Sequence, residues 1–100
     1  MPTYISLLQL TQKGVEALNE SPNRAEAGRR MIQSMGGELK SFYSVLGRYD
    51  AVLIIEAPDD EIAMKISMAN GRMGYSRAET LRAFSEDEYR QMISSLPERP

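Results

Sequence analysis

The side chains best suited to proton transfer lie in one predicted tight turn, Gly47-Arg48-Tyr49-Asp50. A tyrosine hydroxyl can donate a proton and a carboxylate can accept one, so Tyr49 and Asp50 could act together at the mouth of a pocket. Turn geometry alone also favours glycine and aspartate at these positions, and a purely structural turn is the simpler interpretation. Under either interpretation, both side chains sit at the tip of a β-hairpin.

Glu56 is a third candidate for catalysis, because it ends the apolar run 51–55, which predicts a strand buried on both faces. A carboxylate beside such a strand could act as a base. A solvated strand end, or an ion pair with Lys40 or Arg82, accounts for Glu56 more simply. The predicted catalytic set is therefore Tyr49, Asp50 and Glu56.

Several polar side chains interrupt strands that otherwise read as buried. If they share a face, they could line a cavity between the sheet and a second subunit, where a fixed guanidinium would bind a carboxylate or an enolate oxygen. The alternative is a polar subunit interface whose hydrogen bonds are all satisfied. The predicted ligand-binding residues are Tyr4, Ser6, Tyr43, Thr80 and Arg82.

The chain has neither cysteine nor histidine. This excludes thiol catalysis, a Ser-His-Asp triad and zinc held by cysteine or histidine. The acidic run 59–61 is better explained by helix capping than by metal binding. Methionines at helical spacing are better explained as core or interface filler than as metal ligands. We expect no metal and no cofactor.

One hundred residues with a net charge of −2 predict one domain, 1–100. The charge balance argues against a nucleic-acid partner, and without a basic amphipathic helix we expect no membrane partner. The N-terminal segment MPTYISLLQL lacks the basic region of a signal peptide, and no apolar run is long enough to span a bilayer. The expected location is the cytoplasm.

The elements that must position these side chains follow from periodicity and from capping residues. Gly36-Gly37 should end a helix that Ser21 caps and Pro22 begins, and Asn70-Gly71 should end a helix that Asp59 caps. The predicted strands are 3–10, 38–46, 51–55 and 75–84; the predicted helices are 12–18, 21–35, 59–70 and 86–96.

This order, β-α-β-β-α-β plus a last helix, predicts an α+β fold of the ferredoxin-like type with an antiparallel four-stranded sheet. Right-handed crossovers would put both long helices on one face, the first and third strands in the centre and the charged fourth strand at an edge. The other face would then be apolar and uncovered, so we expect a homodimer or higher oligomer in which two sheets pack face to face.

The chain resembles the GYD-domain family of small bacterial and archaeal proteins over nearly its whole length. The matching pieces are PTYISLLQLT, the helix between Ser21-Pro22 and Gly36-Gly37, SFYSVLGRYDAVLIIEAPDD and TLRAFSEDEYR; the turn 47–50 matches the signature G-x-Y-D. The resemblance implies a ferredoxin-like subunit related in architecture to dimeric α+β-barrel proteins. It implies no established activity.

Three functions remain open from the sequence. The first is a small-molecule binding or sensing module that acts as a homo-oligomer on a small acidic or aromatic ligand, and it ranks first because no residue pattern requires catalysis. The second is a cofactor-free isomerase or monooxygenase of the dimeric α+β-barrel type, suggested by fold analogy alone. The third is a structural or interaction protein.

Overall fold

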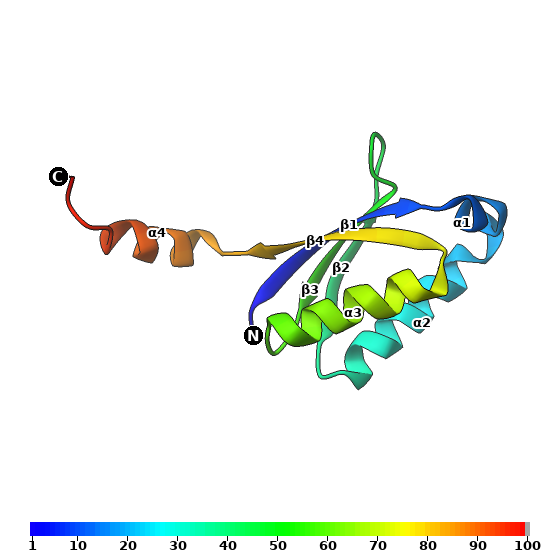
Figure 1. Ribbon diagram of the computed structural model, residues 1–100, viewed down its shortest axis with the longest axis horizontal. Helices are drawn as coiled ribbons and strands as arrows, with labels where there is room; N and C mark the ends of the chain where they lie inside the picture. The colour runs from blue at the N-terminus through cyan, green and yellow to red at the C-terminus, as the bar shows by residue number, and fades with distance from the viewer. Residues whose placement is uncertain (100) are drawn as a thin grey trace.

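The computed structural model describes residues 1–99 (Figure 1). Strands and helices alternate as predicted, with one short 3-10 helix, η1, added before the first long helix. The elements are β1 (Thr3–Leu10), α1 (Gln12–Glu16), η1 (Leu18–Glu20), α2 (Ser21–Ser34), β2 (Glu38–Ser44), β3 (Ala51–Glu56), α3 (Asp60–Met73), β4 (Ser76–Ala83) and α4 (Glu86–Ser94).

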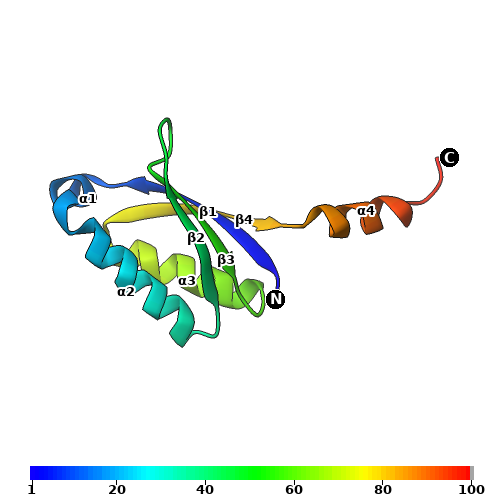
Figure 2. The same ribbon diagram turned by 180° about the vertical axis from the view of Figure 1, so that it is seen from behind.

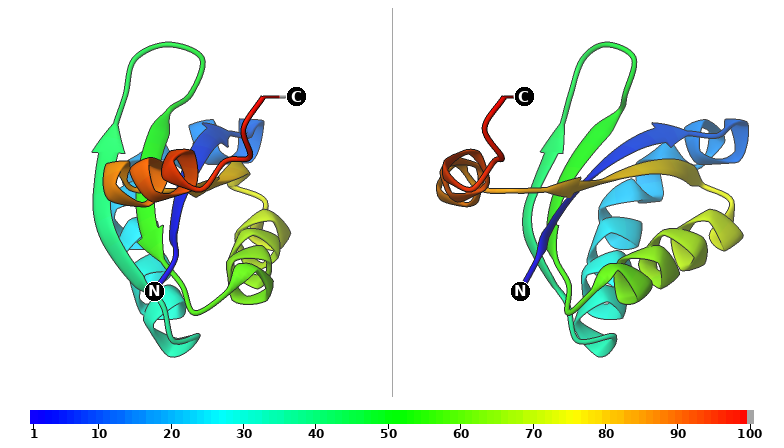
Figure 3. Two further views of the ribbon diagram at one scale, coloured as in Figure 1. Left: turned by 90° about the vertical axis from the view of Figure 1, so that its left-hand side faces the viewer. Right: turned by 60° about the vertical axis from the view of Figure 1, so that its left-hand side comes forward.

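The four strands form one antiparallel sheet in the order β2-β3-β1-β4. Strands β1 and β3 are central and β4 lies at an edge, as predicted. Helices α2 and α3 cover the same face of the sheet, which Figure 3 shows in both views. The predicted ferredoxin-like α+β fold is confirmed.

The hydrophobic core lies between the sheet and these two helices. Ile32 from α2 and Ala63 and Ile66 from α3 are buried against the sheet, as the helical periodicity predicts. The core cluster of buried residues is Tyr4, Ile32, Leu39, Ile55, Ala57, Ala63 and Ile66.

The start of α2 and the end of α3 both differ from the prediction. Ser21 is the first residue of α2 rather than its cap, because η1 leads directly into the helix and no side chain caps its N-terminus. Helix α3 continues through Gly71 to Met73 and ends at Gly74, whose φ of +84° supplies the left-handed conformation that the stop requires. The cap predicted at Asp59 is confirmed, since its side chain accepts a backbone N–H, and the Thr11 side chain caps α1 in the same way.

Strand β2 contains a bulge at Lys40. Leu39 pairs with Ile55 and Ser41 pairs with Ile54, so Lys40 is an extra residue in the ladder. The strict alternation predicted for 38–46 is therefore wrong on one side of the bulge. Leu39 faces the helices together with Phe42, and β2 ends at Ser44 rather than residue 46.

The C-terminal helix α4 forms an arm that leaves the body of the molecule along the direction of β4 (Figures 1 and 2). Ser85 and Glu88 form a capping box at its start, and the helix ends at Ser94, two residues earlier than predicted. The arm lengthens the molecule to 55 Å, against 31 and 20 Å in the other directions. Its apolar residues are exposed: Tyr89, Met92, Ile93 and Leu96.

The second face of the sheet, here called the open face, carries no helix within residues 1–99 (Figure 3). Cross-strand pairing puts five partly exposed aliphatic side chains at its centre: Ile5, Leu7, Val52, Ile54 and Leu81. The predicted uncovered apolar face is therefore present, and α4 does not roof it. Across the described part of the chain, no helix has the length and apolar character needed to cross a bilayer.

Candidate functional site

The predicted turn 47–50 lies in the loop that joins β2 to β3, and its side chains are tied to the neighbouring strands. The Asp50 carboxylate accepts a hydrogen bond from the Leu10 N–H at 2.8 Å, and the Asp50 N–H donates to the Leu8 carbonyl at 2.8 Å. Tyr49 donates its hydroxyl to the Glu79 carboxylate at 2.9 Å. Both candidate catalytic side chains therefore hold the loop against β1 and β4.

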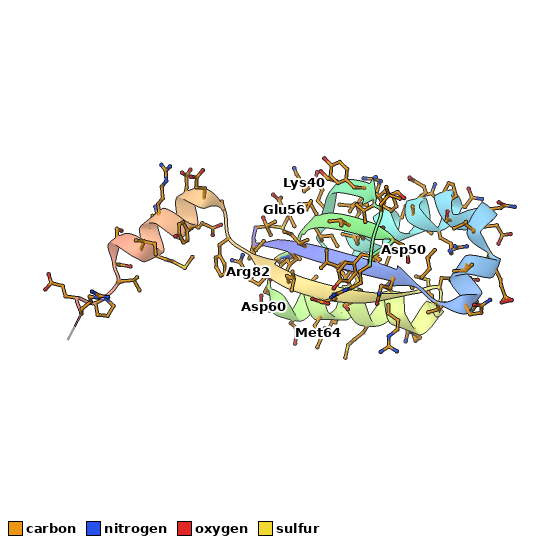
Figure 4. All side chains as sticks on the ribbon, turned by 90° about the horizontal axis from the view of Figure 1, so that it is seen from above. Lys40, Asp50, Glu56, Asp60, Met64 and Arg82 are labelled. Carbon is orange, nitrogen blue, oxygen red and sulfur yellow. The ribbon has the colours of Figure 1, made fainter. Side chains whose placement is uncertain are left out.

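Glu56 lies at the opposite end of the sheet. It is paired with Thr3 on one side and Glu38 on the other, whereas the loop with Asp50 meets β1 near Leu8. Five residues of strand separate Thr3 from Leu8, which amounts to about 17 Å. Figure 4 shows Glu56 and Arg82 near one end of the sheet and Asp50 toward the other. The structure does not bring Tyr49, Asp50 and Glu56 into one site.

Four of the five predicted ligand-binding residues do come together, on the face covered by the helices. Tyr4 pairs with Arg82, and Ser6 pairs with Thr80 across β1 and β4. The hydroxyls of Ser6 and Thr80 share a hydrogen bond of 3.0 Å. Tyr43 pairs with Val52 and so lies on the open face, apart from the other four. These four residues therefore do not face the side on which a second subunit could pack.

Tyr4 is the centre of a charged cluster at the start of α3. Its hydroxyl donates to the Asp60 carboxylate at 2.5 Å, and the Arg82 guanidinium lies 5.7 Å from its ring centre. Burial, followed by the hydrogen bond to Asp60, raises the pKa of Tyr4 to about 12. Arg82 also stacks on Phe84 at 4.2 Å and donates to the carbonyls of Thr3 and Ala83. Tyr4 is therefore a neutral hydrogen-bond donor near pH 7, and Arg82 anchors the end of β4.

A cavity of about 150 Å³ lies between the covered face and the two long helices. Arg24 of α2 is on its wall, with one buried guanidinium nitrogen that has no hydrogen-bond partner within residues 1–99. Arg24 as a whole is only partly buried, and the sequence pattern did not indicate it as a cavity residue. Arg24 is four residues before Gly28 and eight before Ile32, so it lies at the edge of the buried stripe of α2. That spacing is the sequence signal that could have indicated Arg24 as a cavity residue.

Tyr75 is a second residue whose role the sequence pattern did not indicate. Lys13 and Arg24 both lie over its ring, with distances of 4.3 and 4.4 Å to the ring centre. Its carbonyl accepts the Thr11 N–H at 3.1 Å. Tyr75 thus joins α1, α2 and the start of β4, and it fixes the guanidinium of Arg24 at the cavity wall.

Comparison with known proteins links this arrangement to one family. The family model described as GYD domain matches residues 4–93, which include β2, β3 and β4, all of β1 except Thr3, and nearly all of the arm helix. The match therefore covers the open face, the cavity and the G-x-Y-D turn.

A named protein and a crystal structure, both from the bacterium Thermus thermophilus, are similar to this chain. The first is named glutamine synthetase and cystathionine beta-lyase binding protein; it is 33% identical over 84 residues, which are 83% of this chain and 88% of that protein. The second is the crystal structure of TTHA0845, which superposes with a TM-score of 0.54 at 26% identity, over 85% of this chain and 95% of that one. The fold is thus shared with an experimentally determined structure.

Proposed function

The chain belongs to the GYD domain family, and from that premise we propose that it is a homodimeric module that binds partner enzymes. The observation that carries the proposal is the arm helix α4, which projects from the body with its apolar side exposed. A helix of nine residues gains most of its stability from packing rather than from propensity. We therefore propose that the apolar side of the arm packs against the surface of a partner enzyme.

The class of partner is proposed from the relative's name. A protein that is 33% identical over most of this chain is named for binding glutamine synthetase and cystathionine beta-lyase. We propose that this chain binds enzymes of the same class, through Met92 and Ile93 of the arm. We also propose a cytoplasmic location, where such metabolic enzymes work.

Self-association is proposed through the open face. The aliphatic side chains of Ile5, Val52 and Ile54 are only partly buried there, and an isologous two-fold contact would cover each copy with the other. Arg77 and Glu79 lie on the same face, where opposite charges can pair between the two copies. Pairing the two sheets would leave both arms free for the partner enzyme.

A catalytic function has less support. Tyr49 and Asp50 already make hydrogen bonds that hold the loop, and Glu56 lies about 17 Å away along the sheet. We therefore assign the G-x-Y-D turn an architectural role within the module.

The test of partner binding uses the purified full chain, titrated calorimetrically into purified glutamine synthetase and, separately, cystathionine β-lyase. Ile93→Glu puts a charge into the apolar side of the arm, and Gln91→Glu adds the same charge on its other side. We expect at least one enzyme to bind the unchanged chain and Gln91→Glu alike, and to bind Ile93→Glu at least tenfold more weakly. Binding by neither enzyme, or equal binding by all three chains, contradicts the proposal.

The test of self-association is light scattering on Leu81→Glu, in the open face, and on Gln33→Glu, on the outer side of α2. We expect a dimer for the unchanged chain and for Gln33→Glu, and a folded monomer for Leu81→Glu. If the unchanged chain is a monomer, the proposed dimer is contradicted. The proposed binding of enzymes through the arm is tested separately by the calorimetric titration.

A further inference from the structure

The cavity beneath the sheet exists because its lining residues are small. No atom would lie within 4 Å of a Cβ added at Gly28, so there is open space beside α2 at this residue. Alanines and serines line the facing strands and α3 where larger side chains would fill the layer. The small residues are Ala25, Gly28, Ala51, Ser67, Ser76 and Ala78.

The wall of this cavity is mostly apolar, with contributions from Leu8, Leu53 and Ile66. Most of the polar groups on the wall already have hydrogen-bond partners within the protein. Asn70 donates to the Ser76 hydroxyl at 3.0 Å, and the Asp50 carboxylate accepts the Leu10 N–H. Most of the lining therefore favours a ligand with an apolar body.

Arg24 is the exception on this wall. Its Nη1 donates to the Ala17 carbonyl at 2.8 Å and its guanidinium rests on Tyr75, but its Nη2 is buried with no partner in residues 1–99. Within the same residues, no carboxylate lies within 4.0 Å of this guanidinium, whereas Arg29 and Arg30 both pair with Glu26. A buried donor without a partner is costly, and arginine keeps its charge at all ordinary pH values.

We propose that the cavity is a binding site for a short carboxylic acid with an aromatic or branched aliphatic body. The apolar body fills the space beside Gly28, and the carboxylate accepts from Nη2 of Arg24. A cavity of about 150 Å³ is large enough for a benzene-sized body. The pairing supplies the missing acceptor for Nη2 and neutralises the positive charge of the guanidinium. This site does not depend on the proposed protein-binding function.

The experiment measures binding of sodium benzoate and sodium isovalerate to the full chain by calorimetry and ligand-observed NMR. Benzamide, which has the same shape as benzoate without its charge, is the control ligand. We expect benzoate or isovalerate to bind with a Kd on the order of 1 mM or tighter, and benzamide at least tenfold more weakly.

Two pairs of variants locate the site. Arg24→Met removes the guanidinium, with Arg30→Met as its match at an exposed position of the same helix; Gly28→Leu fills the cavity, with Gly71→Leu as its match outside it. We expect both cavity variants to lose carboxylate binding at least tenfold and both controls to retain it. The inference is overturned if neither acid binds at about 10 mM, if benzamide binds as tightly as benzoate, or if folded Gly28→Leu binds as the unchanged chain does.

Discussion

The carboxylate of Asp50 accepts a hydrogen bond from the backbone N–H of Leu10 at 2.8 Å. The backbone N–H of Asp50 donates in turn to the Leu8 carbonyl, also at 2.8 Å. One residue thus extends the pairing of β3 with β1 past Ala51 and Leu8, the last paired residues at that end. The aspartate of the G-x-Y-D turn therefore ties its loop to the strand beside it.

This contact predicts that Asp50→Ala lowers the free energy of unfolding by about 1 kcal/mol, because the Leu10 N–H loses its acceptor. Asp50→Asn keeps an acceptor oxygen and should retain most of the stability. Urea unfolding of the three chains measures the difference. Equal midpoints for Asp50→Ala and the unchanged chain would show that the hydrogen bond contributes nothing.

The buried phenol of Tyr4 predicts a pH dependence of stability at high pH. Burial and the hydrogen bond to Asp60 raise its pKa from 10.0 to about 12, so folding favours the neutral form. This contribution is complete below pH 10 and is lost as the pH rises through 12. The difference in phenolate absorbance between the unchanged chain and Tyr4→Phe should develop around pH 12. A difference centred at pH 10 would contradict it, and Asp60→Asn should move the midpoint downward.

Two glycines predict opposite effects of the same substitution. A Cβ at Gly14 would lie 2.1 Å from the Tyr75 carbonyl oxygen, so Gly14→Ala must push α1 away from β4 and is expected to cost about 1–3 kcal/mol. Gly71 in α3 has open space around it, and Gly71→Ala is expected to stabilise by about 1 kcal/mol. Thermal unfolding should give a lower midpoint temperature for Gly14→Ala and a higher one for Gly71→Ala than for the unchanged chain. A stabilised Gly14→Ala would show that α1 does not pack this closely.

The capping box predicts that the arm helix weakens in acid. The Glu88 carboxylate accepts the Ser85 N–H, which holds its pKa below the ordinary value of 4.5. The stabilisation is present above pH 4.5 and is lost as the pH falls through the lowered pKa. Circular dichroism should therefore show a smaller loss of helix on acidification for Glu88→Gln than for the unchanged chain. Equal losses would point to the Glu86–Arg90 pair as the cause instead.

Most of the fold follows from local signals in the chain. The caps at Thr11, Asp59 and Ser85 and the stop at Gly36 set element boundaries within a residue or two. The misplaced end of α3 has a physical reason, because Gly71 is tolerated inside a helix and Gly74 provides the positive φ. The bulge at Lys40 has no comparable local signal, since it depends on how β2 pairs with β3.

The candidate site was less predictable, because it depends on which side chains lack partners in three dimensions. The sequence indicated an arginine in a pocket for an acidic or aromatic ligand, and it selected Arg82. In the structure Arg82 donates to carbonyls of Thr3 and Ala83, whereas Arg24 has the unpartnered nitrogen. Neither the helical period that contains Arg24 nor the strand alternation that contains Arg82 distinguishes the two, because contacts with backbone carbonyls decide which guanidinium is occupied.

The extra residue at Lys40 also limits how copies of this molecule can join. Strand β2 is an edge strand of the sheet. A regular edge strand could pair with a strand of another molecule, and repeated pairing would extend the sheet without limit. The bulge interrupts the spacing of its backbone donors and acceptors, and the ammonium of Lys40, 3.7 Å from Glu38, adds charge at the same point. The growth of fibrils by strand addition to β2 is therefore disfavoured. Copies of the molecule can instead associate through other surfaces that give closed oligomers with a fixed number of subunits.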